Sequence, residues 1–364
     1  IHCVIDLSFM KKIAIYSVLV ISVFTIIFLA VLLNYRPHTP QLEKYLIKPK
    51  LEHQVGSLKV QFIGNTNVLI TDGKSAILTD GFFTRPSISQ VLWGEIEPDY
   101  DVIEYCMNRA GIHQLDAVIP VHSHFDHAMD SPIVATMTGA KLIGSESTAN
   151  IGRGLGFPED QMIIAESGVP LQIGTMKVTL IKGKHWPYLD EALRLQLLDR
   201  EILNPIIPPA SAFEYYEGAS YTIIIEHTDA TIAIHGSAGF IPNILENFDV
   251  DILFLGMAGL ETMDESYNDS YQVHVVDALS PEVIVPIHWD DFFSPLKKGI
   301  KPRSLLEKWL KGMDVKKSFE EVEIRNLDRT MAVLPLWELV NVLDLMGNIK
   351  HYHLNTLTFE YFTT

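Results

Sequence analysis

The fold is decided by the stretch AVIPVHSHFDH, residues 117–127. Its first five residues are apolar and predict a buried strand, whereas four of the last six carry side chains that bind metal ions. His122 and His124 alternate, so they project to the same side of an extended chain, and Asp126 and His127 follow in the turn. Imidazole and carboxylate groups are preferred ligands of zinc and similar divalent ions, so this strand end is predicted to hold one metal ion or two.

The spacing H-x-H-x-D-H of residues 122–127 resembles the signature of the metallo-β-lactamase superfamily. The pair His185-Trp186 is closer to the phospholipase-D-like and lactonase-like branches than to the β-lactamases themselves. The resemblance runs through scattered motifs between Leu58 and Pro335. It implies an α/β protein with a four-layer αββα sandwich, a metal site at one edge, and hydrolysis by a metal-bound hydroxide.

The resemblance also implies the remaining ligands. His185 follows the predicted strand Lys177–Ile181 and takes the place of the family's third histidine, and His288 follows Glu282–Ile287 at the last ligand position. The expected cofactor is zinc, as one ion or two, with manganese or iron as alternatives. Asp126 is the expected catalytic residue, which holds the nucleophile and takes its proton. The expected ligands of the two metals are, in order, His122, His124 and His185, then Asp126, His127 and His288.

One position departs from the family. The family usually has Gly-Asp-x-Gly with an aspartate that bridges two metals, and this chain has GSAG at residues 236–239, with Ser237 at that place. A hydroxyl is a poor zinc ligand, so a second metal is expected only if another residue compensates for the missing carboxylate. A non-catalytic metal-binding protein with a degraded second site is therefore the alternative to an enzyme. His235 projects to the same side as Ser237 and is a candidate to compensate for the missing carboxylate. The favoured interpretation is a buried histidine whose hydrogen bonds are satisfied by its neighbours.

Three acidic residues near the predicted strand ends have more than one interpretation. Asp80, in the segment LTDG, either orients a metal ligand from behind or forms a turn before glycine. Asp290 and Asp291 come directly after the His288-Trp289 pair. They either orient that histidine, hold a positively charged substrate group, or lie in solvent.

The composition favours a small-molecule substrate over a nucleic acid. With 364 residues, 48% of them hydrophobic, the chain can bury one large core or two modest ones. It has 45 acidic and 28 basic residues and a net charge of −17. Polyanions are bound mainly through Lys and Arg, so no nucleic-acid partner is expected and a nuclease is disfavoured. Cys3 and Cys106 are the only cysteines, which excludes a disulfide framework.

An apolar run near the N-terminus predicts a membrane anchor. Ile13–Leu33 carries no charge, and 21 residues at about 1.5 Å each span roughly 30 Å, the thickness of a bilayer core. A cleaved signal peptide is the alternative, disfavoured because the run is long and no small-x-small site follows. Lys11 and Lys12 precede the run and favour a catalytic domain on the extracytoplasmic side. The predicted divisions are an N-terminal segment (1–12), a transmembrane anchor (13–33), a linker (34–50), a hydrolase domain (51–340) and a C-terminal tail (341–364).

The segment Tyr188–Gly218 looks inserted between two strands and is rich in aromatic residues such as Phe213 and Tyr215. Long segments beside a site often form lids or substrate walls, although a packed surface excursion fits the same pattern. Together with the anchor, this content predicts a small-molecule or lipid-like substrate and contact with the membrane through the N-terminal helix.

Overall fold

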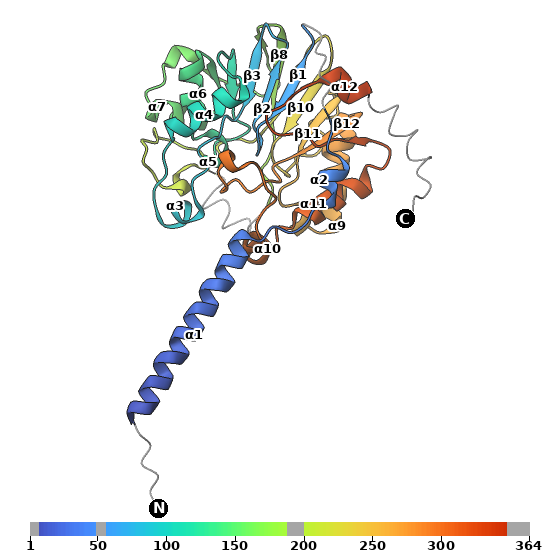
Figure 1. The fold of residues 1–364 in the computed structure, drawn as a ribbon. Coiled ribbons are helices and arrows are strands. Elements are labelled where there is room, and N and C mark those ends of the chain that lie inside the picture. The colour runs from blue at the N-terminus through green and yellow to red at the C-terminus, as the bar shows by residue number, and fades with distance from the viewer. Residues whose placement is uncertain (1–6, 49–55, 188–199, 348–364) are drawn as a thin grey trace, which may run out of the picture.

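Two seven-stranded sheets form the centre of the molecule (Figure 1). The computed structural model describes residues 7–48, 56–187 and 200–347. The first sheet has the order β14-β1-β2-β3-β4-β5-β6, and the second β13-β12-β11-β10-β9-β8-β7. The strands of the first sheet are β1 Lys59–Phe62, β2 Val68–Thr71, β3 Ala76–Thr79, β4 Ala117–Ile119, β5 Lys141–Gly144, β6 Met162–Ile164 and β14 Leu339–Asn341. Those of the second are β7 Pro170–Ile173, β8 Met176–Lys182, β9 Tyr221–Glu226, β10 Thr231–His235, β11 Ile252–Gly256, β12 Val283–Ile287 and β13 Thr330–Met331.

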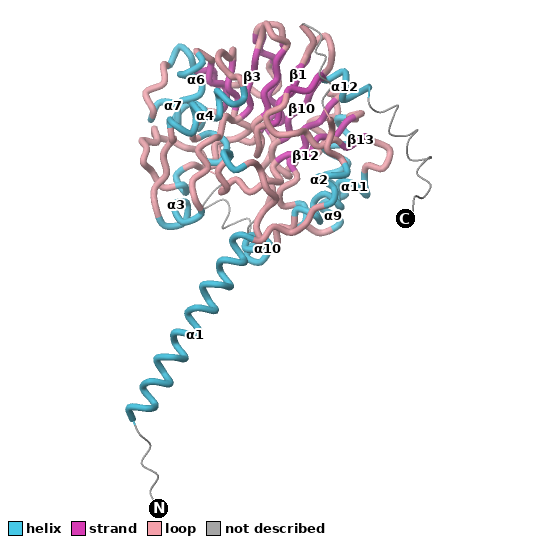
Figure 2. Tube along the Cα trace, in the orientation of Figure 1, coloured by secondary structure: helices cyan, strands magenta, loops and turns pink. Residues whose placement is uncertain are grey.

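Helices cover the outer sides of the two sheets, so the layers follow the predicted αββα order (Figure 2). On the side of the first sheet lie α4 Tyr100–Ala110, α6 Ser131–Thr138 and α7 Glu146–Gly154. On the side of the second lie α2 Pro40–Lys44, α9 Glu265–Tyr271, α11 Val315–Arg325 and α12 Val342–Gly347. The four-layer sandwich predicted from the sequence is thereby confirmed.

The pattern of β4 shows how the layers are packed. Ala117 and Ile119 belong to the core between the sheets, whereas Val118 packs into a second core with Ile103 of α4 and Val134 of α6. Successive side chains of a strand point to opposite faces, so an entirely apolar strand is buried on both. Burial of each such Val or Ile side chain contributes about 1.5–3 kcal/mol. The apolar run before the histidines is therefore what fixes their place in the fold.

The expected ligands follow the carboxyl ends of three strands. β4 pairs in parallel with β3 and β5 and leads to His122, and β12 pairs in parallel with β11 and leads directly to His288. His185 follows β8 in the second sheet. The candidate metal ligands thus gather where the ends of strands from both sheets meet.

Residues on the outer sides of the predicted boundaries at 51 and 340 also pack on the sandwich. In the predicted linker, Ile47 is buried in the main core, and its backbone N–H donates to the Val333 carbonyl at 3.0 Å. In the predicted tail, β14 pairs with β1 through Asn341, and Val342 of α12 is fully buried. Parts of both segments therefore pack on the sandwich, and the rest of the tail lies outside the described residues.

The long helix α1 (Leu7–Asn34) projects from the domain beside α10 (Leu305–Lys311), as Figure 1 shows. Among the described helices it is the one long and apolar enough to cross a membrane, over Met10–Asn34, and its large apolar side chains in that range are exposed except for Leu32. A signal sequence has the same properties. Just after the helix, the Tyr35 carbonyl accepts from Leu305 N–H at 3.0 Å, and Arg36 Nη2 pairs with Asp291 Oδ2 at 2.5 Å.

Candidate metal centre

The motif after β4 forms a short loop and the start of a helix. His124 is the N-cap of α5 (Phe125–Ala128), so Asp126 and His127 lie in its first turn. All four predicted ligands of this motif are buried, and none is more than 9% exposed. Because α5 begins immediately after His124, the carboxylate and the third imidazole are turned back toward the two strand-end histidines. The strand-to-helix turn thus gathers four ligand-type side chains at one point.

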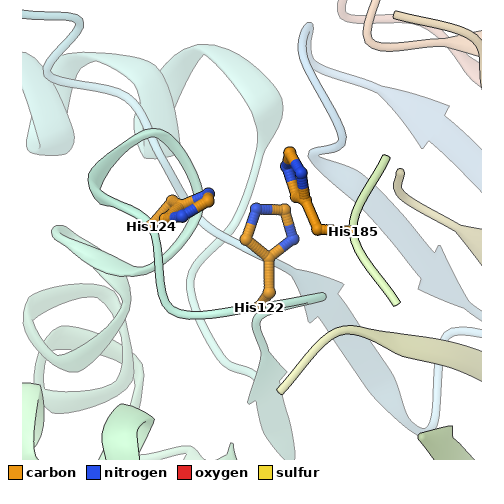
Figure 3. A group of neighbouring side chains, drawn as sticks. All are labelled: His122, His124 and His185. Atoms are coloured by element: carbon orange, nitrogen blue, oxygen red, sulfur yellow. The ribbon is translucent and has the colours of Figure 1, made fainter. Parts of the chain in front are cut away.

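The first ligand group is formed by His122, His124 and His185, whose side chains converge from two segments of the chain (Figure 3). One ligand atom from each lies within 4.8 Å of the others. The ring centroids are 4.7 Å apart for His122 and His124, and 4.9 Å apart for His122 and His185. The structure therefore brings the predicted third histidine to the motif across 63 residues of sequence.

Hydrogen bonding in the first group leaves lone pairs for a metal ion. Both ring nitrogens of His122 and the Nε2 of His124 are buried without a hydrogen-bond partner among the described residues. The Nδ1 of His185 is 3.1 Å from the Trp186 carbonyl, which can only accept, so this nitrogen carries the proton and Nε2 the lone pair. A buried polar atom without a partner costs about 1–3 kcal/mol, and a metal ion would satisfy it. The donor set fits a divalent ion with one position left open.

The charge state of these histidines agrees with that fit. Burial lowers the pKa of His122 and His124 well below the ordinary range, and the neighbouring imidazoles lower it further. Both rings are therefore neutral at neutral pH, and neutral imidazole is the form that binds metals.

The second ligand group is formed by Asp126, His127 and His288, whose ligand atoms also lie within 4.8 Å of one another. The Oδ2 of Asp126 is 3.5 Å from His127 Nε2 and 3.7 Å from His288 Nε2. The ring centroids of His122 and His127 are 3.9 Å apart, so the two groups adjoin. Burial acts to lower the pKa of His127, but Asp126 and Asp80 outweigh it and raise that pKa above the ordinary value.

Asp80 orients His127, as one of its two predicted interpretations requires. Its Oδ2 is 2.7 Å from His127 Nδ1, and its Oδ1 accepts from Val121 N–H at 2.9 Å. Thr66 donates to the same carboxylate. A carboxylate behind a histidine fixes the tautomer and ring orientation. The turn interpretation also holds, because Asp80 has a positive φ of 56° just before Gly81.

The remaining candidates from the sequence lie outside the two groups. His235 is a satisfied core residue, since its ring nitrogens contact Thr222 Oγ1 at 2.8 Å and the Gly239 carbonyl at 2.9 Å. Ser237 Oγ accepts from Trp186 N–H at 3.1 Å.

The two acids after His288 form ion pairs with arginines. Asp290 Oδ2 accepts from Arg85 Nη2 at 2.7 Å, and Asp291 pairs with Arg36. The described contacts therefore support neither of the two predicted roles of these acids, orienting His288 or holding a substrate cation. A different neighbour of His288 is the buried Arg303, whose Nη2 lies 3.3 Å from His288 Nδ1 and which no sequence motif marks.

A cavity of about 320 Å³ opens onto both ligand groups. The polar residues that line the cavity are mainly the candidate ligands, and most of its walls are apolar. The described part of the predicted insertion contributes to one wall, which agrees with its expected place beside the site. The apolar and aromatic lining residues are Ile88, Val91, Leu92, Phe125, Trp186, Ala212, Phe213, Tyr215, Ala258, Phe292, Phe293 and Met313.

Comparison with known sequences agrees with this geometry. The family described as the beta-lactamase superfamily domain matches residues 59–288, more than half of the chain. The chain therefore belongs to the beta-lactamase superfamily, as the H-x-H-x-D-H motif predicted.

The individual relatives have low sequence identity to this chain or match only a small part of it. A UPF0173 metal-dependent hydrolase of Anaeromyxobacter sp. is 23% identical over 65% of this chain and 76% of its own length. One of Myxococcus xanthus is 37% identical, but the match covers 20% of this chain and only 24% of that relative. Among solved structures, Igni18, a metallo hydrolase from Ignicoccus hospitalis, aligns with a TM-score of 0.49 at 19% identity, over 78% of this chain and 97% of the other.

Proposed function

We propose that the protein is a membrane-anchored, metal-dependent hydrolase that cleaves an ester, lactone, amide or phosphodiester bond in a substrate with an apolar chain. The observation that supports it most is the convergence of three imidazoles at the end of an apolar cavity, those of His122 and His124 being buried and neutral and that of His185 partly buried. Zinc is the proposed metal, since three histidines with an open fourth position are typical of catalytic zinc sites. Several relatives are named metal-dependent hydrolases, which supports the same proposal.

The first ligand group would hold the metal, with His122, His124 and His185 as ligands. The chemistry supplied by a zinc ion in such a site is Lewis acidity, which lowers the pKa of a water molecule to about 7 and polarises the substrate's oxygen. The protein residues supply the rest. Asp126 lines the cavity, and its Oδ2 is placed to accept the proton of the attacking water. Asp80 and His127 hold the Asp126 side of the site in position.

The apolar walls would bind the substrate's chain and exclude bulk water from the reacting bond. Phe292 and Phe293 form part of the wall and directly follow Asp291. Asp291 in turn pairs with Arg36, two residues beyond the end of α1. The wall of the cavity is thus tied to the end of the proposed anchor, which supports a substrate taken from the membrane surface.

The test is turnover by the full chain, purified in detergent and loaded with zinc. Esters, lactones, amides and phosphodiesters of short and long apolar chains would be compared at matched concentrations. We expect metal-dependent hydrolysis of at least one class, with kcat/KM rising with chain length until the cavity is filled. A folded, zinc-loaded protein that hydrolyses none of them would contradict the proposal.

A non-catalytic metal-binding protein is the second candidate, and Ser237 is the observation that favours it. Its hydroxyl already accepts the Trp186 N–H, and it brings no charge to the centre. This candidate predicts tight metal binding without turnover on the same substrate panel, so the experiment above separates the two.

A further inference from the structure

A buried arginine adjoins the second ligand group and also lines the cavity. Arg303 is 4% exposed, and its Nη2 donates to the His288 carbonyl at 3.0 Å and to His288 Nδ1 at 3.3 Å. Its Nη1 contacts the Met313 sulfur, and the guanidinium lies 5.7 Å from the centre of the Phe292 ring. All of these partners are uncharged. A full positive charge is therefore held next to a residue that was expected to bind a metal cation.

The contact with Arg303 determines the tautomer of His288. A guanidinium can only donate, so the Nδ1 of His288 must accept and carries no proton. A neutral imidazole then has its proton on Nε2, which is the nitrogen 3.7 Å from Asp126 Oδ2. A metal ligand needs a lone pair at that nitrogen. In this arrangement His288 presents an N–H to the second group.

The other histidines of the centre show the opposite arrangement. His127 Nδ1 contacts the Asp80 carboxylate, and His185 Nδ1 contacts the Trp186 carbonyl, both of which are acceptors. Their protons therefore lie on Nδ1, the nitrogen on the far side of the ring from the site. His288 is the one imidazole of the two groups with a cation as its described side-chain partner, and its ring also has a hydrogen bond with its own backbone.

The balance of charge also disfavours a second metal. The two groups share no ligand, and Asp126 is the only carboxylate in either of them. Arg303 is charged at every accessible pH and would repel a second dication bound at His288. The nearby carboxylates of Asp80 and Glu261 interact with His127 and with Arg303 itself, which leaves Asp126 as the carboxylate that faces such an ion.

We propose that the centre binds a single metal ion, in the first ligand group, and that Arg303 and His288 take the place of a second. In this arrangement Arg303 is a positioning residue. It holds His288 with Nε2–H directed at Asp126 and at a substrate oxygen beside it. The inference rests on the proposed metal site and revises the expectation that His288 is a metal ligand.

The test is a metal titration of the full chain in detergent. Protein stripped with a chelator would be titrated with cobalt(II), with bound metal measured after desalting and the absorption of the bound ion recorded. We expect one ion per chain for the wild type. Arg303→Met removes the charge and the donor at similar length, frees His288 to turn its lone pair inward, and is expected to bind a second ion. Arg325→Met, at a partly buried ion pair away from the centre, is the matched control and should bind one.

A second measurement remains decisive if Arg303→Met does not fold. Nitrogen-15 NMR of histidine-labelled, zinc-loaded wild type distinguishes the two neutral tautomers, and we expect the Nε2–H form for His288. Two ions bound by the wild type, an Nδ1–H tautomer for His288, or a second ion absent from well-folded Arg303→Met would each overturn the inference. No bound ion at all in the wild type would instead count against the proposed function.

Discussion

The two ligand groups of the centre adjoin, yet their surroundings are opposite in kind. His122, His124 and His185 face one another, and burial together with the neighbouring imidazoles keeps His122 and His124 neutral. In the second group, Asp126 and His127 are linked to Asp80, and His288 is held by Arg303. Similar residue types at similar distances therefore have different chemistry, because the partner behind each ring decides where its proton and lone pair lie.

On the proposed assignment, a ligand-type residue in the right place is not sufficient to make a metal ligand. The distance criterion treats the two groups alike, since each has ligand atoms within 4.8 Å. The contacts behind the rings separate His288 from the others, since the Nδ1 of His127 faces a carboxylate and its buried Nε2 has no hydrogen-bond partner among the described residues. The first group is arranged to receive a cation, and the second already has one at its edge in Arg303.

The largest expected effect separates His124 from His288. His124→Ala removes a ligand of the proposed metal, so we expect loss of most bound zinc and a fall in kcat/KM of roughly 10³-fold or more. His288→Ala is expected to keep its metal and to lose about 10- to 100-fold, as for a residue acting from outside the ligand set. Metal content and turnover would be measured together. The exposed His113→Ala is the control, and equal metal loss in both centre variants would refute the distinction.

The contact behind His127 is the next test. Asp80→Asn keeps the shape of the side chain but removes the charge that fixes His127 Nδ1–H, and we expect kcat to fall by about 10- to 100-fold. Zinc content should stay near that of the wild type, because Asp80 contacts no residue of the first group. Asp72→Asn removes a buried carboxylate elsewhere and should leave kcat unchanged. Loss of zinc in Asp80→Asn would show that His127 takes part in holding the metal.

The metal-free protein offers a test by pH, because His124 and His127 have pKa values shifted in opposite directions. Burial and the nearby imidazoles lower the pKa of His124 in the folded protein. In the unfolded chain this pKa is about 6.5, so the unfolded state takes up the proton first as the pH falls, and the folded state loses stability. Asp126 and Asp80 outweigh burial and raise the pKa of His127, so its contribution is present below about pH 6.5 and is lost as pH rises.

Chemical unfolding of chelated protein at pH 7 and pH 5 would read out these signs. We expect the free energy of unfolding to fall less on acidification in His124→Gln than in the wild type, and to fall more in His127→Gln. The same change in both variants would contradict the assigned charge states.

The smallest expected effect concerns the link between the anchor and the cavity wall. Arg36→Gln removes the ion pair with Asp291, a partly exposed contact worth about 1 kcal/mol or less. We expect a loss of a few-fold in turnover of a long-chain substrate presented in vesicles and no change with a water-soluble substrate. Lys44→Gln, which removes a more exposed ion pair with Glu323, is the control. An equal loss with both substrates would point to a role of Arg36 other than the membrane link.

The sequence was sufficient for the sandwich and for the residues that gather at its edge. The apolar run 117–121 and the strand-end positions of His185 and His288 are local patterns, and the structure brings them together as expected. The contacts that decide where each imidazole carries its proton and its lone pair could not be predicted from local sequence patterns. Arg303 lies 15 residues after His288 in a segment without a motif, and only packing places its guanidinium on that ring.

The ends of the domain show the same limit. Ile47 and Val342 lie in segments that read as a linker and a tail, because neither segment has a long periodic pattern. Each segment packs through only a few residues, and those residues contact parts of the sandwich that are distant in the sequence.

The most direct test of the central claim is a zinc titration of the chelator-stripped full chain, with hydrolysis of a long-chain ester recorded at each point. Activity is predicted to be absent without zinc, to rise in proportion to the first bound ion, and to reach its plateau at one ion per chain. Full hydrolysis by protein without metal, or a folded protein that binds no zinc, would contradict it.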